Sequence, residues 1–244
     1  MYAYLEGMIR EMLDLIMPRE CLVCGRQLGA AENHICIWCA EDLPLTYFWE
    51  QPHNPMADQF NALLERYRPL GEKMDYAYAT ALLYYHHGNP YKKIPQALKY
   101  NHNIRAGRYF SARLGQLMAR YPYYASVDLV VPVPLHWRRR WQRGYNQAEV
   151  IAAELARALD ARLRTDVLAR QRRTRTQTRL DAEARIKNVQ GVFIIRKRLE
   201  TNHILLVDDT FTTGATLATC YWAVRKAFGP EVRISVATLA FVNS

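Results

Sequence analysis

Two neighbouring aspartates, Asp208 and Asp209, are the residues of this 244-residue chain with the clearest potential for chemistry. They follow the apolar run Ile204–Val207 and precede a hydroxyl-rich segment, Thr210–Thr216. In an open α/β sheet, polar groups at the carboxyl end of a central strand face the ligand crevice. Hydroxyls and amides of this segment would face a phosphate at a helix N-terminus, and Gly214 would let the backbone approach that phosphate closely. The other residues concerned are Thr210, Thr212, Thr213, Ala215 and Thr216. Two solvated aspartates before an ordinary threonine-rich turn have the same composition, so spacing alone leaves both interpretations open.

The carboxylates of Asp208 and Asp209 would repel a phosphate, so we expect them to face something else. Ribose hydroxyls are suitable donors for such acceptors, and a Mg²⁺ ion nearby would suit their oxygen atoms. The pattern therefore predicts a site for a phosphorylated ribose.

Four of the five cysteines form two pairs, Cys21-x2-Cys24 and Cys36-x2-Cys39. Thiolates at this spacing can close a tetrahedron around Zn²⁺, and Gly25 permits the tight turn that the chain makes around the metal. Two disulfides and a redox dithiol are the alternatives. We favour a structural zinc site, which four cysteine ligands would leave closed to catalysis. The fifth cysteine, Cys220, is expected in a core helix.

Basic residues are concentrated in two segments, and the whole chain carries a formal net charge of +10. In the first segment, Arg140, Arg143 and the amides near Gly144 could bind a polyphosphate, because the arginine fork pairs with phosphate oxygens. A solvated basic loop with tryptophans packed on the surface explains the same residues. The second segment, 170–190, is polar and could close over a charged ligand, or it could be disordered without function.

Alternating apolar and helical patterns predict the elements that would position these residues. Strands are expected over 76–85, 128–133, 191–195, 203–207 and 232–241, and helices over 91–100, 106–120, 146–159 and 215–228. This alternation predicts an α/β domain with a mainly parallel sheet. We expect an N-terminal helix and zinc module over 1–49, a linker of helical character interrupted by prolines over 50–75, and the main domain over 76–244. The N-terminal apolar stretch contains acids and has helical spacing, so a signal peptide is rejected and a cytoplasmic location is expected, without a transmembrane segment.

The segment Val207-Asp-Asp-Thr-Phe-Thr-Thr-Gly-Ala-Thr216 resembles the signature loop of type I phosphoribosyltransferases. The resemblance implies that Asp208 and Asp209 contact the ribose hydroxyls of phosphoribosyl diphosphate, with Mg²⁺, and that Thr210–Thr216 hold its 5′-phosphate. Thr210 departs mildly from the family, which usually has an aliphatic residue or serine there.

Three further segments narrow the resemblance to the ComF family of competence-associated proteins, which includes GntX-type proteins. They are Pro18-Arg-Glu-Cys-Leu-Val-Cys-Gly25, Val131-Pro-Val-Pro with Arg143-Gly-Tyr-Asn-Gln-Ala-Glu149, and the spaced set Arg172, Thr174, Gln177, Leu180, Arg185 and Asn188. The resemblance implies that Arg143, Gly144, Arg172, Gln177 and Arg185 contact the diphosphate, the last three from a flexible hood.

The family resemblance implies a role in DNA uptake during natural transformation. If the site turns over, we expect Mg²⁺-dependent displacement of diphosphate, with no catalytic acid or base identifiable. The alternative is a non-catalytic protein that binds single-stranded DNA or a DNA-translocation ATPase and uses the fold as a scaffold or sensor. The acceptor is not specified by the sequence, although the segment 99–103 is a candidate for its pocket.

Overall fold

The computed structural model describes residues 18–86, 88–100, 103–135, 137–171 and 192–242. The expected N-terminal helix and most of the basic segment 170–190 lie outside these residues. The centre of the protein is a five-stranded parallel sheet in the order β1-β7-β6-β2-β3. Its strands are β1 (Ala79–Tyr85), β2 (Leu129–Pro132), β3 (Arg162–Leu163), β6 (His203–Phe211) and β7 (Arg233–Val242). The predicted fold class, a mainly parallel sheet flanked by helices, is confirmed.

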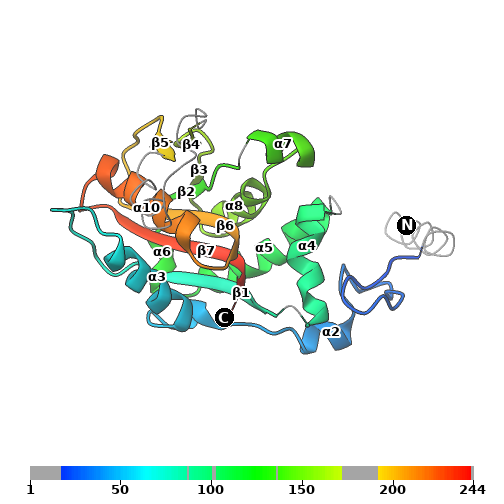
Figure 1. Ribbon diagram of the computed structural model, residues 1–244. Helices are drawn as coiled ribbons and strands as arrows, with labels where there is room; N and C mark the ends of the chain where they lie inside the picture. The colour runs from blue at the N-terminus through cyan, green and yellow to red at the C-terminus, as the bar shows by residue number, and fades with distance from the viewer. Residues whose placement is uncertain (1–17, 87, 101–102, 136, 172–191, 243–244) are drawn as a thin grey trace.

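Helices cover both faces of this sheet, as Figure 1 shows. On one face α5 (Ile104–Met118) and α8 (Gln147–Ala158) share a core with Leu205 and Val207 of β6. On the other face α3 (Pro55–Arg66) and α10 (Ala215–Phe228) share a core with Ile204 and Leu206. Burial on both faces explains why the strands read as continuous apolar runs.

The helix ends follow local sequence signals. Asn146, the predicted N-cap of α8, accepts a hydrogen bond from the Ala148 amide at 3.2 Å. Asn54 accepts one from the Ala57 amide at 2.9 Å, and Pro55 occupies the first position of α3. Such caps satisfy amides that have no partner within the helix.

The connections place the ligand crevice between β2 and β6. The chain leaves β2 through α8 on one face and returns to β3, whereas it leaves β6 through α10 on the other face and returns to β7. The two connections therefore diverge above the carboxyl ends of neighbouring strands. Open α/β sheets bind ligands at such a switch point.

A second sheet of two antiparallel strands, β4 (Leu168–Arg170) and β5 (Phe193–Ile195), lies beside α10. We expected a strand over 191–195; the structure has a shorter one, Phe193–Ile195, and it does not join the parallel sheet. Three residues are too few for an apolar pattern to indicate which sheet they join.

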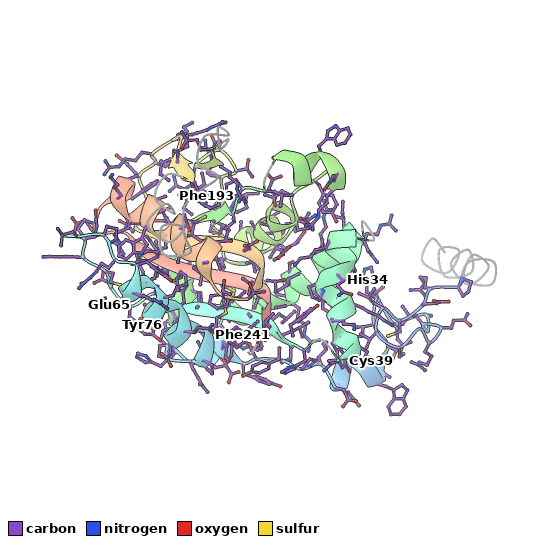
Figure 2. All side chains as sticks on the ribbon, viewed as in Figure 1. His34, Cys39, Glu65, Tyr76, Phe193 and Phe241 are labelled. Atoms are coloured by element: carbon purple, nitrogen blue, oxygen red, sulfur yellow. The ribbon has the colours of Figure 1, made fainter. Side chains whose placement is uncertain are left out.

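The N-terminal module contains α2 (Ile37–Glu41) and the 3₁₀ turn η1 (Phe48–Glu50). Next along the chain, past β1, come the 3₁₀ turn η2 (Pro90–Lys92) and α4 (Lys93–Tyr100). Figure 1 shows α4 and α5 between the module and the sheet. In Figure 2, His34 and Cys39 of the module lie beside α4, at the opposite end of the molecule from Glu65 and Tyr76.

Helices lie in both the expected linker, whose sequence pattern is helical, and the expected basic loop. The expected linker contains α3, whose Met56, Phe60 and Leu64 are fully buried. The expected basic loop contains α7 (Trp137–Arg143), and α6 (Pro122–Ala125) precedes β2. The domain boundaries at 49, 75 and 76 stay a prediction. Within the described ranges, no helix has the length and apolar character needed to cross a membrane.

Candidate functional site

The acidic pair lies within strand β6 rather than after it. We expected the strand to end at Val207, but β6 continues to Phe211, where Asp208 pairs with Thr238 and Thr210 with Ala240 of β7. The strand extends because β7 offers backbone partners beyond the point where β2 ends at Pro132. Both aspartates are half-buried and lie at the switch-point crevice.

A lysine from α4 neutralises part of this acidic pair. Lys99 Nζ lies 3.0 Å from Asp209 Oδ1 and donates a hydrogen bond to Thr210 Oγ1 at 3.1 Å. The Asp209 amide donates to Asp208 Oδ1 at 2.8 Å. Burial, and then the charge of Asp209, raise the pKa of Asp208 to about 7, although Lys99 and Arg170 act in the opposite direction. Near neutral pH the pair can therefore both accept and donate hydrogen bonds.

The loop after the pair has a backbone that only glycine fits well. Gly214 has φ of 73°, and a Cβ there would lie 2.6 Å from Cζ of Phe211. Gly214 is also the N-cap of α10, so no side chain at that position accepts from the first-turn amides. Thr212, Thr213, Ala215 and Thr216 are exposed around this helix start. Amides of this kind form an anion site at the positive end of the helix dipole.

The neighbouring strand β2 leads into the basic part of the crevice. Asn146 Nδ2 donates to the Val133 carbonyl at 3.0 Å and fixes the start of α8 beside the end of β2. Arg143 Nη1 donates to Gln147 Oε1 at 2.9 Å, and exposed Gly144 has φ of 73°. These contacts place Arg143 at the end of α7 and Gly144 in the turn between α7 and α8.

A cavity of about 530 Å³ lies at the carboxyl end of β2. Its apolar wall includes Pro132, Pro134, Leu135, Leu168 and Ile194. Three arginines, Arg140, Arg170 and Arg196, line it together with the single acid Glu149, which pairs with Arg140 at 3.2 Å. Among the described residues around it, the cavity is therefore net positive and suits an anionic ligand.

The structure thus places Asp208 and Asp209 on β6 and the segment 210–216 at the transition from β6 to α10, with Arg143 and Gly144 on the segment that follows β2. Arg172, Gln177 and Arg185 lie outside the described residues. Sequence reasoning did not identify Lys99 as the partner of Asp209, having considered it only for an acceptor pocket. It also did not identify Arg196, for which the sequence contains no local signal.

The four paired cysteines form a cluster suited to one metal ion. Their Sγ atoms all lie within 4.8 Å of one another, and Cys24 Sγ lies 3.8 Å from Cys36 Sγ. A tetrahedron with Zn–S bonds of about 2.3 Å has S···S edges of about 3.8 Å. None of the five cysteines forms a disulfide. The donor set and its geometry fit a structural zinc ion.

Backbone groups support the thiolate form at Cys21, one of the four expected metal ligands. Burial acts to raise the pKa of Cys21, but hydrogen bonds from the amides of Cys24, Cys36 and Val23 lower it overall, to about 6. The Cys36 amide lies 3.4 Å from Cys21 Sγ. Gly25, at φ of 78°, makes the turn expected from the sequence.

No protein-family model matches the chain. It is 37% identical over 91 residues to "DNA utilization protein YhgH" of Escherichia coli K12, a match covering 37% of this chain and 40% of that protein. It is 34% identical over 110 residues to "Competence protein F" of Haemophilus influenzae, covering 44% of this chain and 48% of that protein. The chain thus spans less than half the length of the curated relatives it matches. Over the matched part, these relatives confirm the resemblance to the ComF family.

Proposed function

From this relationship to ComF-type proteins, we propose that the protein binds phosphoribosyl diphosphate in the crevice between β2 and β6 and acts in the uptake or utilisation of DNA. The observation that carries the first part is the juxtaposition of the acidic pair with the Gly214 loop. Carboxylates that face ribose hydroxyls and helix amides that face a phosphate are the two halves needed to hold a phosphorylated ribose.

Different residues of the crevice hold the three parts of the ligand, which are the ribose, the 5′-phosphate and the diphosphate. Asp208 and Asp209 accept hydrogen bonds from the ribose hydroxyls, and the loop Thr210–Thr216 holds the 5′-phosphate. Arg143 and Gly144 act on the diphosphate, and the cavity arginines Arg140 and Arg170 add positive charge beside it. The hood residues Arg172, Gln177 and Arg185 belong to the same proposal through the family resemblance.

Magnesium would enter this site with the diphosphate. Asp208 and Asp209 supply carboxylate oxygens of the kind that Mg²⁺ prefers, and Lys99 already neutralises one side of Asp209. When bound, the ion would neutralise charge on the diphosphate.

The same arrangement would support transfer of the phosphoribosyl group to an acceptor. The acceptor forms a bond to the anomeric carbon of the ribose, and the bond from that carbon to the diphosphate oxygen breaks. The departing electron pair leaves with diphosphate, which the arginines stabilise. The protein contributes mainly by positioning the ligand and stabilising charge.

Calorimetric titration with phosphoribosyl diphosphate, with and without Mg²⁺, tests binding. We expect saturable binding to the wild type and a loss of at least about 100-fold in Asp208→Asn/Asp209→Asn, because two hydrogen-bond partners of the ribose change. Asp58→Asn, an exposed change on α3, is the control. Failure of the wild type to bind contradicts the proposal, whereas diphosphate release with any base or amine would establish transfer.

The DNA role is supported by the names of the relatives and by the surface of α7. Trp141 is 86% exposed there, between the basic residues Arg140 and Arg143. Exposed aromatic rings stack on unpaired bases, while arginines bind phosphates. This second activity would use a surface next to the crevice.

A salt series separates the two activities. We expect affinity for single-stranded DNA to fall steeply with salt and to weaken about tenfold in Trp141→Ala, with Trp38→Ala on α2 as the matched control. Affinity that follows the Asp208→Asn/Asp209→Asn change instead would argue that DNA competes for the ribose-phosphate crevice.

A further inference from the structure

The short helix α4 joins the cysteine module to the acidic pair. At its start, Lys93 Nζ donates to the Val23 carbonyl at 2.8 Å, and the hydroxyl of Tyr91, in the preceding turn, donates to the Cys39 carbonyl at 3.1 Å. At its end, Lys99 contacts Asp209 and Thr210. A helix rises about 1.5 Å per residue, so about 9 Å of helix separates Lys93 from Lys99.

The second half of the crevice also contacts this helix. The hydroxyl of Tyr145, in the Arg-Gly-Tyr-Asn segment, donates to the Leu98 carbonyl. Leu98 and Lys99 are consecutive, so adjacent residues of α4 contact the segment after β2 and the pair on β6. The end of α4 therefore influences both sides of the proposed ligand.

Packing leaves α4 little freedom to shift independently. Ile94 and Leu98 are buried in one continuous core with Cys21, Val23 and Cys36 of the module. Gly107 of α5 lies so close that a Cβ there would be 2.3 Å from Cδ2 of Leu98. A displacement at one end of so short and tightly packed a helix is transmitted to the other.

We propose that Lys99 is a positioning residue for the acidic pair, and that α4 couples metal occupancy of the cysteine module to the ribose-phosphate crevice. The inference rests on the proposed function and adds its regulation. Val23 lies between two metal-site cysteines, and Cys39 belongs to the site itself, so the carbonyls that hold α4 are those whose positions the metal fixes. Loss of the metal releases them, and Lys99 then holds Asp209 less well.

Coupling of this kind is reciprocal. Ribose 5-phosphate, which carries the ribose and the 5′-phosphate of the proposed ligand, serves as the probe. If zinc tightens ribose 5-phosphate binding by a given factor, ribose 5-phosphate tightens zinc binding by the same factor. We expect a factor of about 5 to 10, within the usual range for coupled sites. If the cysteine module only stabilised the fold, replacing Lys99 would not change the coupling between zinc binding and ribose 5-phosphate binding.

The first test uses the zinc-loaded 244-residue chain, with metal content verified for each variant. Tyr91→Phe/Lys93→Met should weaken ribose 5-phosphate binding about 5-fold without loss of zinc. The controls are Tyr109→Phe, whose ring contacts His34 of the module, and Lys226→Met, an exposed change on α10. Affinity equal to that of the controls would overturn the coupling.

The second test does not depend on ligand binding and therefore separates this inference from the proposed function. Chelation of zinc should accelerate hydrogen exchange of the amides of residues 208–214 in the wild type. In Lys99→Met the same amides should exchange quickly with and without zinc, and Lys99→Arg should restore part of the zinc dependence. Exchange that ignores zinc in the wild type would contradict the inference, even if ribose 5-phosphate binds.

Discussion

The ammonium of Lys99 and the carboxylate of Asp209 lie 3.0 Å apart. The two side chains are largely buried, with 23% of Lys99 and 17% of Asp209 exposed. The lysine thereby supplies positive charge to two neighbouring acids that would otherwise repel each other. This ion pair connects the helix α4 with the strand that carries the proposed ribose site.

Replacing Lys99 by methionine should raise the pKa of Asp208 further above about 7. Lys99 acts to lower this pKa, so its removal leaves burial and the charge of Asp209 less opposed. Carbon-13 NMR of the aspartate carboxyl groups, titrated from pH 5 to 9, measures the shift. An unchanged titration midpoint in Lys99→Met would show that the ammonium does not act on the pair.

Two glycines with the same backbone angle allow the steric requirement of the loop to be measured. Gly144 and Gly214 both have φ of 73°, but among the described residues only Gly214 has a neighbour that an added Cβ would meet, the Phe211 ring at 2.6 Å. Gly144→Ala should lower the free energy of unfolding by about 1 kcal/mol, the cost of a left-handed alanine. Gly214→Ala should cost about 3 kcal/mol because the clash adds to it.

Urea denaturation at constant pH compares these two variants. Equal losses of stability would mean that Phe211 moves away freely, and that the loop is less tightly defined than its packing indicates.

The cysteine cluster should hold about one zinc ion per chain, measurable by elemental analysis. Cys21→Ser should lose the metal and lower the stability of the N-terminal region by a few kcal/mol, because metal binding contributes to folding. Cys220→Ala is the matched control, since Cys220 is buried in α10, away from the cluster. Metal-free wild-type protein with intact disulfides would refute the zinc assignment.

A buried histidine at the amino end of β6 should make stability depend on pH. His203 lies between Ser126 and Ser235, each 2.8 Å from one of its ring nitrogens. Burial, assisted by Arg233, lowers its pKa to about 4. The unfolded chain has the ordinary pKa of about 6.5, so it takes up the proton first. His203 therefore leaves the free energy of unfolding unchanged above about pH 6.5 and lowers it as the pH falls from 6.5 towards 4.

Between pH 7.5 and pH 5 this histidine should cost the wild type about 2 kcal/mol of unfolding free energy. His203→Gln, which does not titrate, should lack that part of the loss, while all other groups contribute equally to both proteins. Parallel pH profiles for the two proteins would mean that water or a charged partner stabilises the protonated ring.

The elements that sequence predicted well are those with strong local signals. Four consecutive apolar residues marked the buried part of β6, and Asn146 marked the start of α8. The extension of β6 to Phe211 could not be predicted, because it depends on the length of β7, which is distant in the chain.

The residues of the candidate site were likewise predictable only where they are close together in the sequence. Asp208, Asp209 and the Gly214 loop are contiguous, so their pattern indicated a shared task. Lys99 carries no such signal, since only the packing of α4 against α5 brings it to Asp209. The spacing of residues along the sequence does not reveal charged residues that reach a site from another helix or strand.

The central claim is that the β6 loop holds the phosphate of a ribose, and amide NMR on threonine-labelled protein tests it most directly. Titration with ribose 5-phosphate should shift the amides of Thr210, Thr212, Thr213 and Thr216 together with one dissociation constant, while the amides of Thr46 and Thr201 do not shift. In Asp208→Asn/Asp209→Asn the shifts should require far higher ligand concentrations. Saturating ligand that leaves the four loop threonines unmoved would contradict this function.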